Sequence, residues 1–192
     1  IYFMIYLGIL LAVLAELKYI HSVIVGQSKP NFLAWGIFTV SMILVLVSSY
    51  SLGARDSLWV IGMFTLLHLI TTIIAFRFRV FSITLFEKIL LVLVGLSILL
   101  WVITDNAWTA LLINILVDTL GFTVILYKLY LHPKTEDVSA WFISFIAYGI
   151  NLISITAWTP QEYLVVISNM FWIGLLLVLS LRKPQNKKSQ NL

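Results

Sequence analysis

The chain has no cysteine, and only 10% of its 192 residues are charged. The absence of cysteine excludes a disulfide framework and any metal site built from thiolates. The scarcity of charge, together with 61% hydrophobic residues and a mean hydropathy of +1.06, lies well outside the range of soluble domains. The composition therefore predicts an integral membrane protein with no room for a separate soluble domain.

Recognisable catalytic and cofactor-binding motifs are also missing. The sequence contains no phosphate-binding loop, no dinucleotide-binding glycine pattern and no nucleophile elbow. Its three histidines do not have the spacing of a known metal motif. We therefore expect no enzyme activity, no cofactor and no bound metal.

Seven apolar stretches each have the length that a membrane-spanning helix needs, which is about 20 residues. Because lipid offers no partner to backbone N–H and C=O groups, each stretch is predicted to be an α-helix. Turn-forming and polar residues separate the stretches. The predicted spans are residues 2–25, 32–52, 57–76, 83–103, 108–131, 138–158 and 163–181.

Lysine and arginine are distributed unevenly between the two predicted sides of the membrane. Eleven of the twelve fall on one side, and only Arg55 falls on the other. An excess of basic residues marks the cytoplasmic side. We therefore predict a protein of the cell (plasma) membrane with its N-terminus outside and its polar tail, residues 184–192, in the cytoplasm. Since the basic residues mark topology, the net charge of +4 does not indicate a nucleic-acid partner.

The first three predicted helices resemble the last three. In each triplet a proline follows the first helix and a tryptophan opens the second: Pro30 and Trp35, then Pro133 and Trp141. The two triplets share one orientation, because an odd helix lies between them. The predicted 3+1+3 plan comprises a first three-helix repeat at 1–80, a connector helix at 81–106 and a second, parallel repeat at 107–183.

This plan, with the loop GQSKP at residues 26–30 and the stretch KLYLHP at 128–133, resembles the SWEET and PQ-loop (MtN3-like) membrane proteins. The resemblance covers the whole chain as an architecture. The Pro-Gln pairs of that family are absent from the corresponding stretches, near residues 17–19 and 123–125. The resemblance implies a carrier or facilitator in the lipid bilayer. It would move a small polar solute, of the sugar, nucleoside or vitamin-precursor class, by alternating access.

Polar residues inside the spans are the candidates for a substrate site, because charge at membrane depth is costly and usually faces the bundle interior. Glu16 and Asp118 occupy related places in the two repeats. The resemblance to SWEET-like carriers, which place an asparagine and a tryptophan at the sugar site, adds a pair on the last helix. The predicted substrate-binding residues are Asp118, Asn114, Asn169, Trp172, Glu16 and His68.

Two alternatives to a carrier remain at this point. A non-transporting receptor or assembly subunit would use the same polar residues to hold helices together. An intramembrane enzyme would need titratable groups such as Glu16, His68 and Asp118 to converge.

Trp35 and Trp141, at the inner ends of their helices, are predicted to belong to the interfacial aromatic belt. The sequence is compatible with either a monomer or a homo-oligomer.

Overall fold

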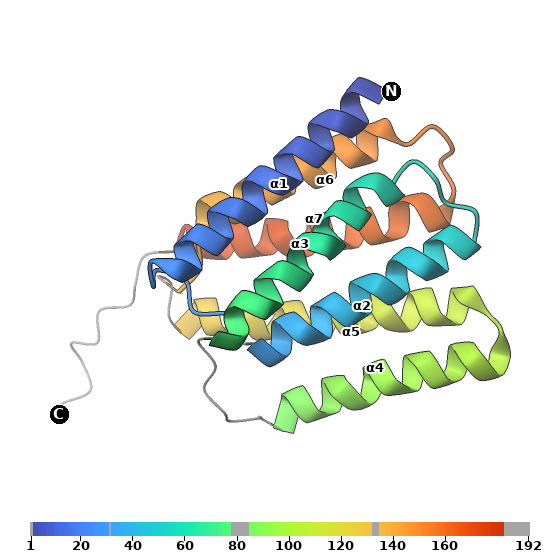
Figure 1. The fold of residues 1–192 in the computed structure, drawn as a ribbon, viewed down its shortest axis with the longest axis horizontal. Helices are drawn as coiled ribbons and strands as arrows, with labels where there is room; N and C mark the ends of the chain where they lie inside the picture. Colours follow the sequence, from blue (N-terminus) through green and yellow to red (C-terminus); the bar gives the residue numbers. More distant parts are fainter. Residues whose placement is uncertain (1, 31, 78–84, 132–134, 183–192) are drawn as a thin grey trace.

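The computed structural model describes residues 2–30, 32–77, 85–131 and 135–182, which form seven α-helices and no strand (Figure 1). The all-helical prediction is confirmed. The helices are α1 (Tyr2–Ile24), α2 (Phe32–Ser51), α3 (Leu58–Arg77), α4 (Leu85–Thr104), α5 (Ala107–Leu131), α6 (Val138–Ser154) and α7 (Pro160–Ser180). The predicted tail and Pro133 lie outside the described residues.

The helices are apolar enough for a membrane. By length and composition, α1, α3, α5 and α7 can each cross a bilayer, and α2, α4 and α6 contain shorter apolar stretches. This architecture is compatible with a helical membrane protein.

Local signals set the helix ends. Gly26 and Gly53 adopt positive φ angles of 77° and 93°, the left-handed conformation that commonly ends a helix. Pro160 occupies the first turn of α7. The sixth predicted span is four residues too long, because the backbone N–H of Thr156 leaves the helix and donates to the Asp56 carboxylate at 2.8 Å.

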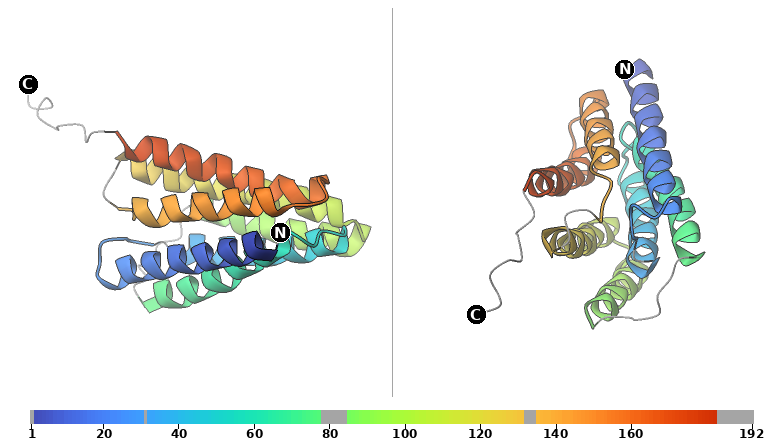
Figure 2. Two further views of the ribbon diagram at one scale, coloured as in Figure 1. Left: turned by 90° about the horizontal axis from the view of Figure 1, so that it is seen from above. Right: turned by 90° about the vertical axis from the view of Figure 1, so that its left-hand side faces the viewer.

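For description we call α1–α3 the first triplet and α5–α7 the second triplet, with α4 outside both. In the first triplet α3 packs against both α1 and α2, and in the second α7 packs against both α5 and α6. The triplets meet where α1 packs against α6 and α2 packs against α5 (Figures 1 and 2). The additional helix, α4, packs on α5 and α2 at the edge of the bundle.

Successive helices run in opposite directions, so their connections gather at two ends of the bundle (Figure 1). We name these ends after one residue each. The Glu162 end contains the α2–α3 and α6–α7 connections, and the Lys128 end contains the α1–α2 connection and residues 135–137.

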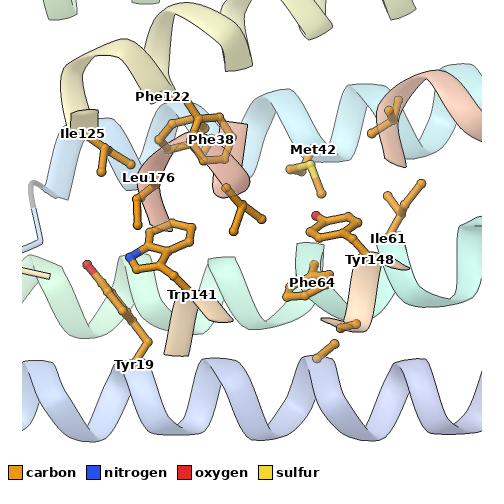
Figure 3. Packing of buried hydrophobic residues seen from close by; sticks show 14 of the residues in the cluster. Tyr19, Phe38, Met42, Ile61, Phe64, Phe122, Ile125, Trp141, Tyr148 and Leu176 are labelled. Atoms are coloured by element: carbon orange, nitrogen blue, oxygen red, sulfur yellow. The ribbon is translucent and has the colours of Figure 1, made fainter. Parts of the chain in front are cut away.

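The main core lies between the triplets and is rich in aromatic side chains (Figure 3). Trp35 and Trp141 belong to this core, with exposures of only 5% and 8%. The interfacial-belt prediction is therefore wrong for both. Each tryptophan sits in the first turn of its helix on the face that points into the bundle, and proximity to a helix end does not reveal which face that is.

Candidate functional site

One small cavity lies inside the bundle, and every helix except α4 contributes to its lining. The centre of a water molecule can occupy about 30 Å³ of this cavity, so the cavity has room for one or two waters. The polar lining residues are Glu16, His68, Asp118, Ser144, Tyr148 and Asn169. Four of the six predicted site residues are therefore brought to one place.

Glu16 of α1 is held by two side chains from α3. His68 Nε2 lies 3.2 Å from Glu16 Oε1, and the hydroxyl of Thr71 donates to Glu16 Oε2 at 3.0 Å. His68 and Thr71 are three residues apart and so share a helix face. The His68 ring also packs edge-on against Trp35, with 5.0 Å between centroids.

Asp118 of α5 reaches the same cavity from the second triplet. Its side chain is buried, at 4% exposure, and its Oδ1 atom has no hydrogen-bond partner. His68 Nδ1 and the Tyr148 hydroxyl are also buried without a partner. An unsatisfied buried polar atom costs about 1–3 kcal/mol, so three of them on one cavity indicate a place for a bound molecule.

The amide of Asn169 lines the cavity, and its Nδ2 donates to the carbonyl of Val165 at 3.0 Å. The two remaining predicted site residues do not line the cavity. Asn114 donates to the Ser97 hydroxyl at 2.7 Å and thereby joins α5 to α4. The Trp172 indole donates to Thr119 at 3.1 Å.

Aromatic rings make up much of the remaining wall, and sequence reasoning missed them as site residues. Phe64 stacks on Tyr148 with centroids 4.6 Å apart and an interplanar angle of 7° (Figure 3). Toward the Lys128 end, Tyr19 packs against Trp35 at 4.9 Å and Trp141 at 6.0 Å. The matching positions of Trp35 and Trp141 in the two triplets were the signal that could have identified these two residues as part of the site. Phe64 and Tyr148 gave none, because aromatics are common throughout apolar helices.

A buried carboxylate closes the Glu162 end. Glu162, 3% exposed in the first turn of α7, accepts hydrogen bonds from the α2–α3 connection. The donors are the backbone N–H groups of Arg55, Asp56 and Ser57 and the Ser57 hydroxyl. Because the donors come from the first triplet and the acceptor from the second, these bonds tie the triplets together.

Another buried carboxylate lies at the Lys128 end. Glu136, with a side chain that is 3% exposed, pairs with Lys128 at 2.6 Å and accepts a hydrogen bond from the Trp141 indole at 3.1 Å. Lys128 also donates to the carbonyl of Lys29 at 2.9 Å. The cavity is thus covered at this end by aromatic rings and, beyond them, by an ion pair.

The described lining of the cavity carries two carboxyl groups and one imidazole but no lysine or arginine. Such a set can hold a small polar molecule within an aromatic wall. No group of three or more His, Cys, Asp or Glu side chains that could hold a metal occurs among the described residues. No protein-family model, curated protein or solved structure matches the chain.

Proposed function

We propose that the protein is a membrane carrier that moves a small polar solute by alternating access around the central cavity. The observation that carries this proposal is the convergence of Asp118, His68 and Tyr148, each with an unpartnered buried polar atom, on one cavity between the two triplets. Carriers built from repeats place their binding site at the repeat interface, near the middle of the bilayer.

The packing of the helices supports a 3+1+3 plan with parallel repeats, as in the SWEET-like proteins. Within each triplet the third helix packs against both of the others. Between triplets, the α1–α6 contact has a counterpart in the α5–α2 contact. Corresponding helices also run in the same direction (Figure 1). A rotation that exchanges the triplets would therefore preserve the main contacts.

The contacts that hold the two triplets together at both ends of the bundle, on either side of the cavity, support alternating access. Glu162 seals one end through the α2–α3 connection, and Tyr19, Trp35 and Trp141 cover the other. On this proposal, an occluded state would keep these contacts at both ends, and each open state would break those at one end. From the distribution of basic residues we propose that the Glu162 end faces outside and the Lys128 end faces the cytoplasm of the cell.

The test is uptake by proteoliposomes of a panel of radiolabelled sugars, nucleosides, vitamin precursors and amines. We expect the protein to move at least one of them and Asp118→Asn to reduce that uptake by about tenfold or more, since the substitution removes the unpaired carboxylate. Thr65→Val is the matched control. Thr65 is buried on α3, its hydroxyl donates to its own helix at Ile61, and it does not line the cavity.

Two results would contradict the proposal. One is uptake that Asp118→Asn and Thr65→Val leave equally unchanged. The other is the absence of uptake of every solute by a correctly folded protein, combined with a loss of stability or of a partner in Asp118→Asn. The second result is what a non-transporting assembly subunit would give.

A second candidate, an intramembrane enzyme, is favoured by the contact between Glu16 and His68. A carboxylate that orients a histidine is a common arrangement for a general base. The hydroxyl of Ser144 lines the same cavity but donates to the carbonyl of Ala140 at 3.2 Å. Because this hydroxyl faces its own helix rather than the histidine, we place the carrier first.

A further inference from the structure

Building on the proposed carrier function, we propose that the solute is a small organic cation: a primary ammonium ion without a carboxylate group. The notable feature of the cavity is a mismatch between its free acceptors and its free donors. The resemblance to SWEET-like proteins leads one to expect a neutral sugar, which brings both donors and acceptors. The lining residues fit a ligand that brings donors and positive charge.

The lining carries more acidic groups than basic groups. Glu16 and Asp118 supply two carboxyl groups, and His68 is the only basic group among the described lining residues. Even a fully protonated His68, paired with Glu16, leaves the Asp118 carboxylate without a counter-ion. A buried unpaired carboxylate is costly, and a bound cation removes that cost.

The three unpartnered atoms can all accept a hydrogen bond. His68 Nε2 faces Glu16, so in a neutral imidazole its Nδ1 carries the lone pair. The Asp118 carboxylate and the Tyr148 hydroxyl oxygen also accept hydrogen bonds. A primary ammonium has three N–H donors, one for each of these atoms, and charge-assisted hydrogen bonds are the strong ones.

Apart from the Tyr148 hydroxyl, the lining offers few donors that are not already used within the protein. The Asn169 amide donates to Val165, the Ser144 hydroxyl to Ala140 and the Trp141 indole to Glu136. A sugar or nucleoside would therefore find few free donors for its own acceptor oxygens. A carboxylate, as in an amino acid, would lie beside two acids with no lysine or arginine to pair with it.

The aromatic wall and the size of the cavity agree with an organic cation. The rings of Trp35, Phe64, Phe122 and Trp141 line the cavity, and aromatic faces attract ammonium groups. The space for one or two waters is close to that needed by methylammonium, which has two heavy atoms. Larger amines would require the aromatic side chains to move.

The test is equilibrium binding of radiolabelled methylammonium to the full-length protein purified in detergent. We expect saturable binding that ethanolamine displaces. Four other compounds should displace methylammonium at least about tenfold more weakly than ethanolamine does. Ethylene glycol and glucose carry no charge, glycine carries a carboxylate, and the sodium ion of equimolar sodium chloride has no N–H donor. Tetramethylammonium, which is cationic but has no N–H donor, should also compete more weakly than ethanolamine.

Variants separate the site from the fold. Asp118→Asn should weaken methylammonium binding by about tenfold or more, Asp118→Glu should retain part of it, and Thr65→Val should leave it unchanged. Thermal melting of each variant checks folding. Displacement by glucose, glycine or sodium chloride as effective as by ethanolamine would overturn the proposal, and so would unchanged binding by a folded Asp118→Asn protein.

Counterflow in proteoliposomes, with equal pH on both sides, separates this inference from the proposed function. If methylammonium binds but does not exchange across the membrane, the ligand class stands and the carrier function fails. If a sugar exchanges while methylammonium neither binds nor exchanges, the carrier function stands and the ligand class fails. If nothing binds or exchanges, both are wrong.

Discussion

Two buried glutamates, Glu162 and Glu136, lie at opposite ends of the bundle and are stabilised in different ways. Glu162 has no cation among its hydrogen-bond donors, which are three backbone N–H groups and one hydroxyl. Glu136 has a cation, Lys128, and the indole of Trp141. Both side chains are buried, but only Glu162 has all of its hydrogen-bond donors on the other triplet.

This difference indicates which end separates more easily. If the triplets move apart at the Glu162 end, that carboxylate loses all four donors. If they move apart at the Lys128 end, Glu136 loses its interaction with Tyr19 but keeps Lys128 and Trp141, which belong to its own triplet. The bonds between triplets there are fewer than at the Glu162 end. They are the bond from Lys128 to the Lys29 carbonyl, the bond from the Lys29 backbone N–H to the Thr135 carbonyl at 3.4 Å and the Lys18–Asp137 pair. Under the proposed carrier function, we therefore expect the Lys128 end to open more readily.

The largest effect is expected for Glu162→Ala. This change leaves the donors at Asp56 and Ser57 without an acceptor. Each unsatisfied buried donor costs about 1–3 kcal/mol, so we expect a total loss of about 3–5 kcal/mol. The measurement is the free energy of unfolding in mixed micelles, from titration with a denaturing detergent. Glu162→Gln should fall between Ala and the native protein, because its amide keeps one acceptor oxygen. A Glu162→Ala protein as stable as the native one would show that these bonds do not hold the triplets together.

Glu136→Ala is expected to cost less, about 2 kcal/mol, in the same titration. Lys128 keeps its bond to the Lys29 carbonyl after the change, and its partly exposed side chain can reach water. The Trp141 indole loses its acceptor. Equal losses for Glu136→Ala and Glu162→Ala would remove the asymmetry between the two ends.

Much of the fold could be predicted from the sequence, because long apolar runs separated by turn residues permit few alternatives to helices. The apolar runs give the helix ends to within three residues everywhere except the end of α6. That end depends on Thr156, which bonds to Asp56 a hundred residues away. A contact between distant loops leaves no local pattern, so hydropathy extends the span past the true end of the helix.

The sequence predicted the titratable residues of the candidate site correctly. It did not predict which amide and indole side chains face the cavity, because that depends on how each helix is rotated about its axis. Glu16, His68 and Asp118 face the cavity because a titratable group in a membrane helix has few other places to go. Asn114 and Trp172 find partners on neighbouring helices instead, in Ser97 and Thr119. An amide or an indole can form its hydrogen bonds either in the cavity or with a neighbouring helix, so the sequence alone does not show which position it takes.

The aromatic cover at the Lys128 end can be tested by labelling, since the chain has no native cysteine. Ser144→Cys places a reporter in the cavity lining, close to Tyr19, Trp35 and Trp141. Adding Trp141→Ala should raise its labelling by an impermeant maleimide about tenfold from the Lys128 side, equivalent to about 1.4 kcal/mol. Adding Trp172→Ala, which changes a tryptophan outside the lining, is the control. A rise that is equal from both sides would contradict closure by Trp141.

The smallest effect is expected for Lys18→Ala, below about 0.5 kcal/mol. Lys18 Nζ lies 3.9 Å from Asp137 Oδ2, and the lysine side chain is 44% exposed, so solvent screens the pair. Asp137 also caps α6 by accepting from the backbone N–H groups of Ser139 and Ala140. Asp137→Ala should therefore cost more than Lys18→Ala, about 1 kcal/mol, through the lost cap. If Lys18→Ala instead costs as much as Glu136→Ala, the triplets are tied at the Lys128 end by ion pairs, and that end has no advantage in opening.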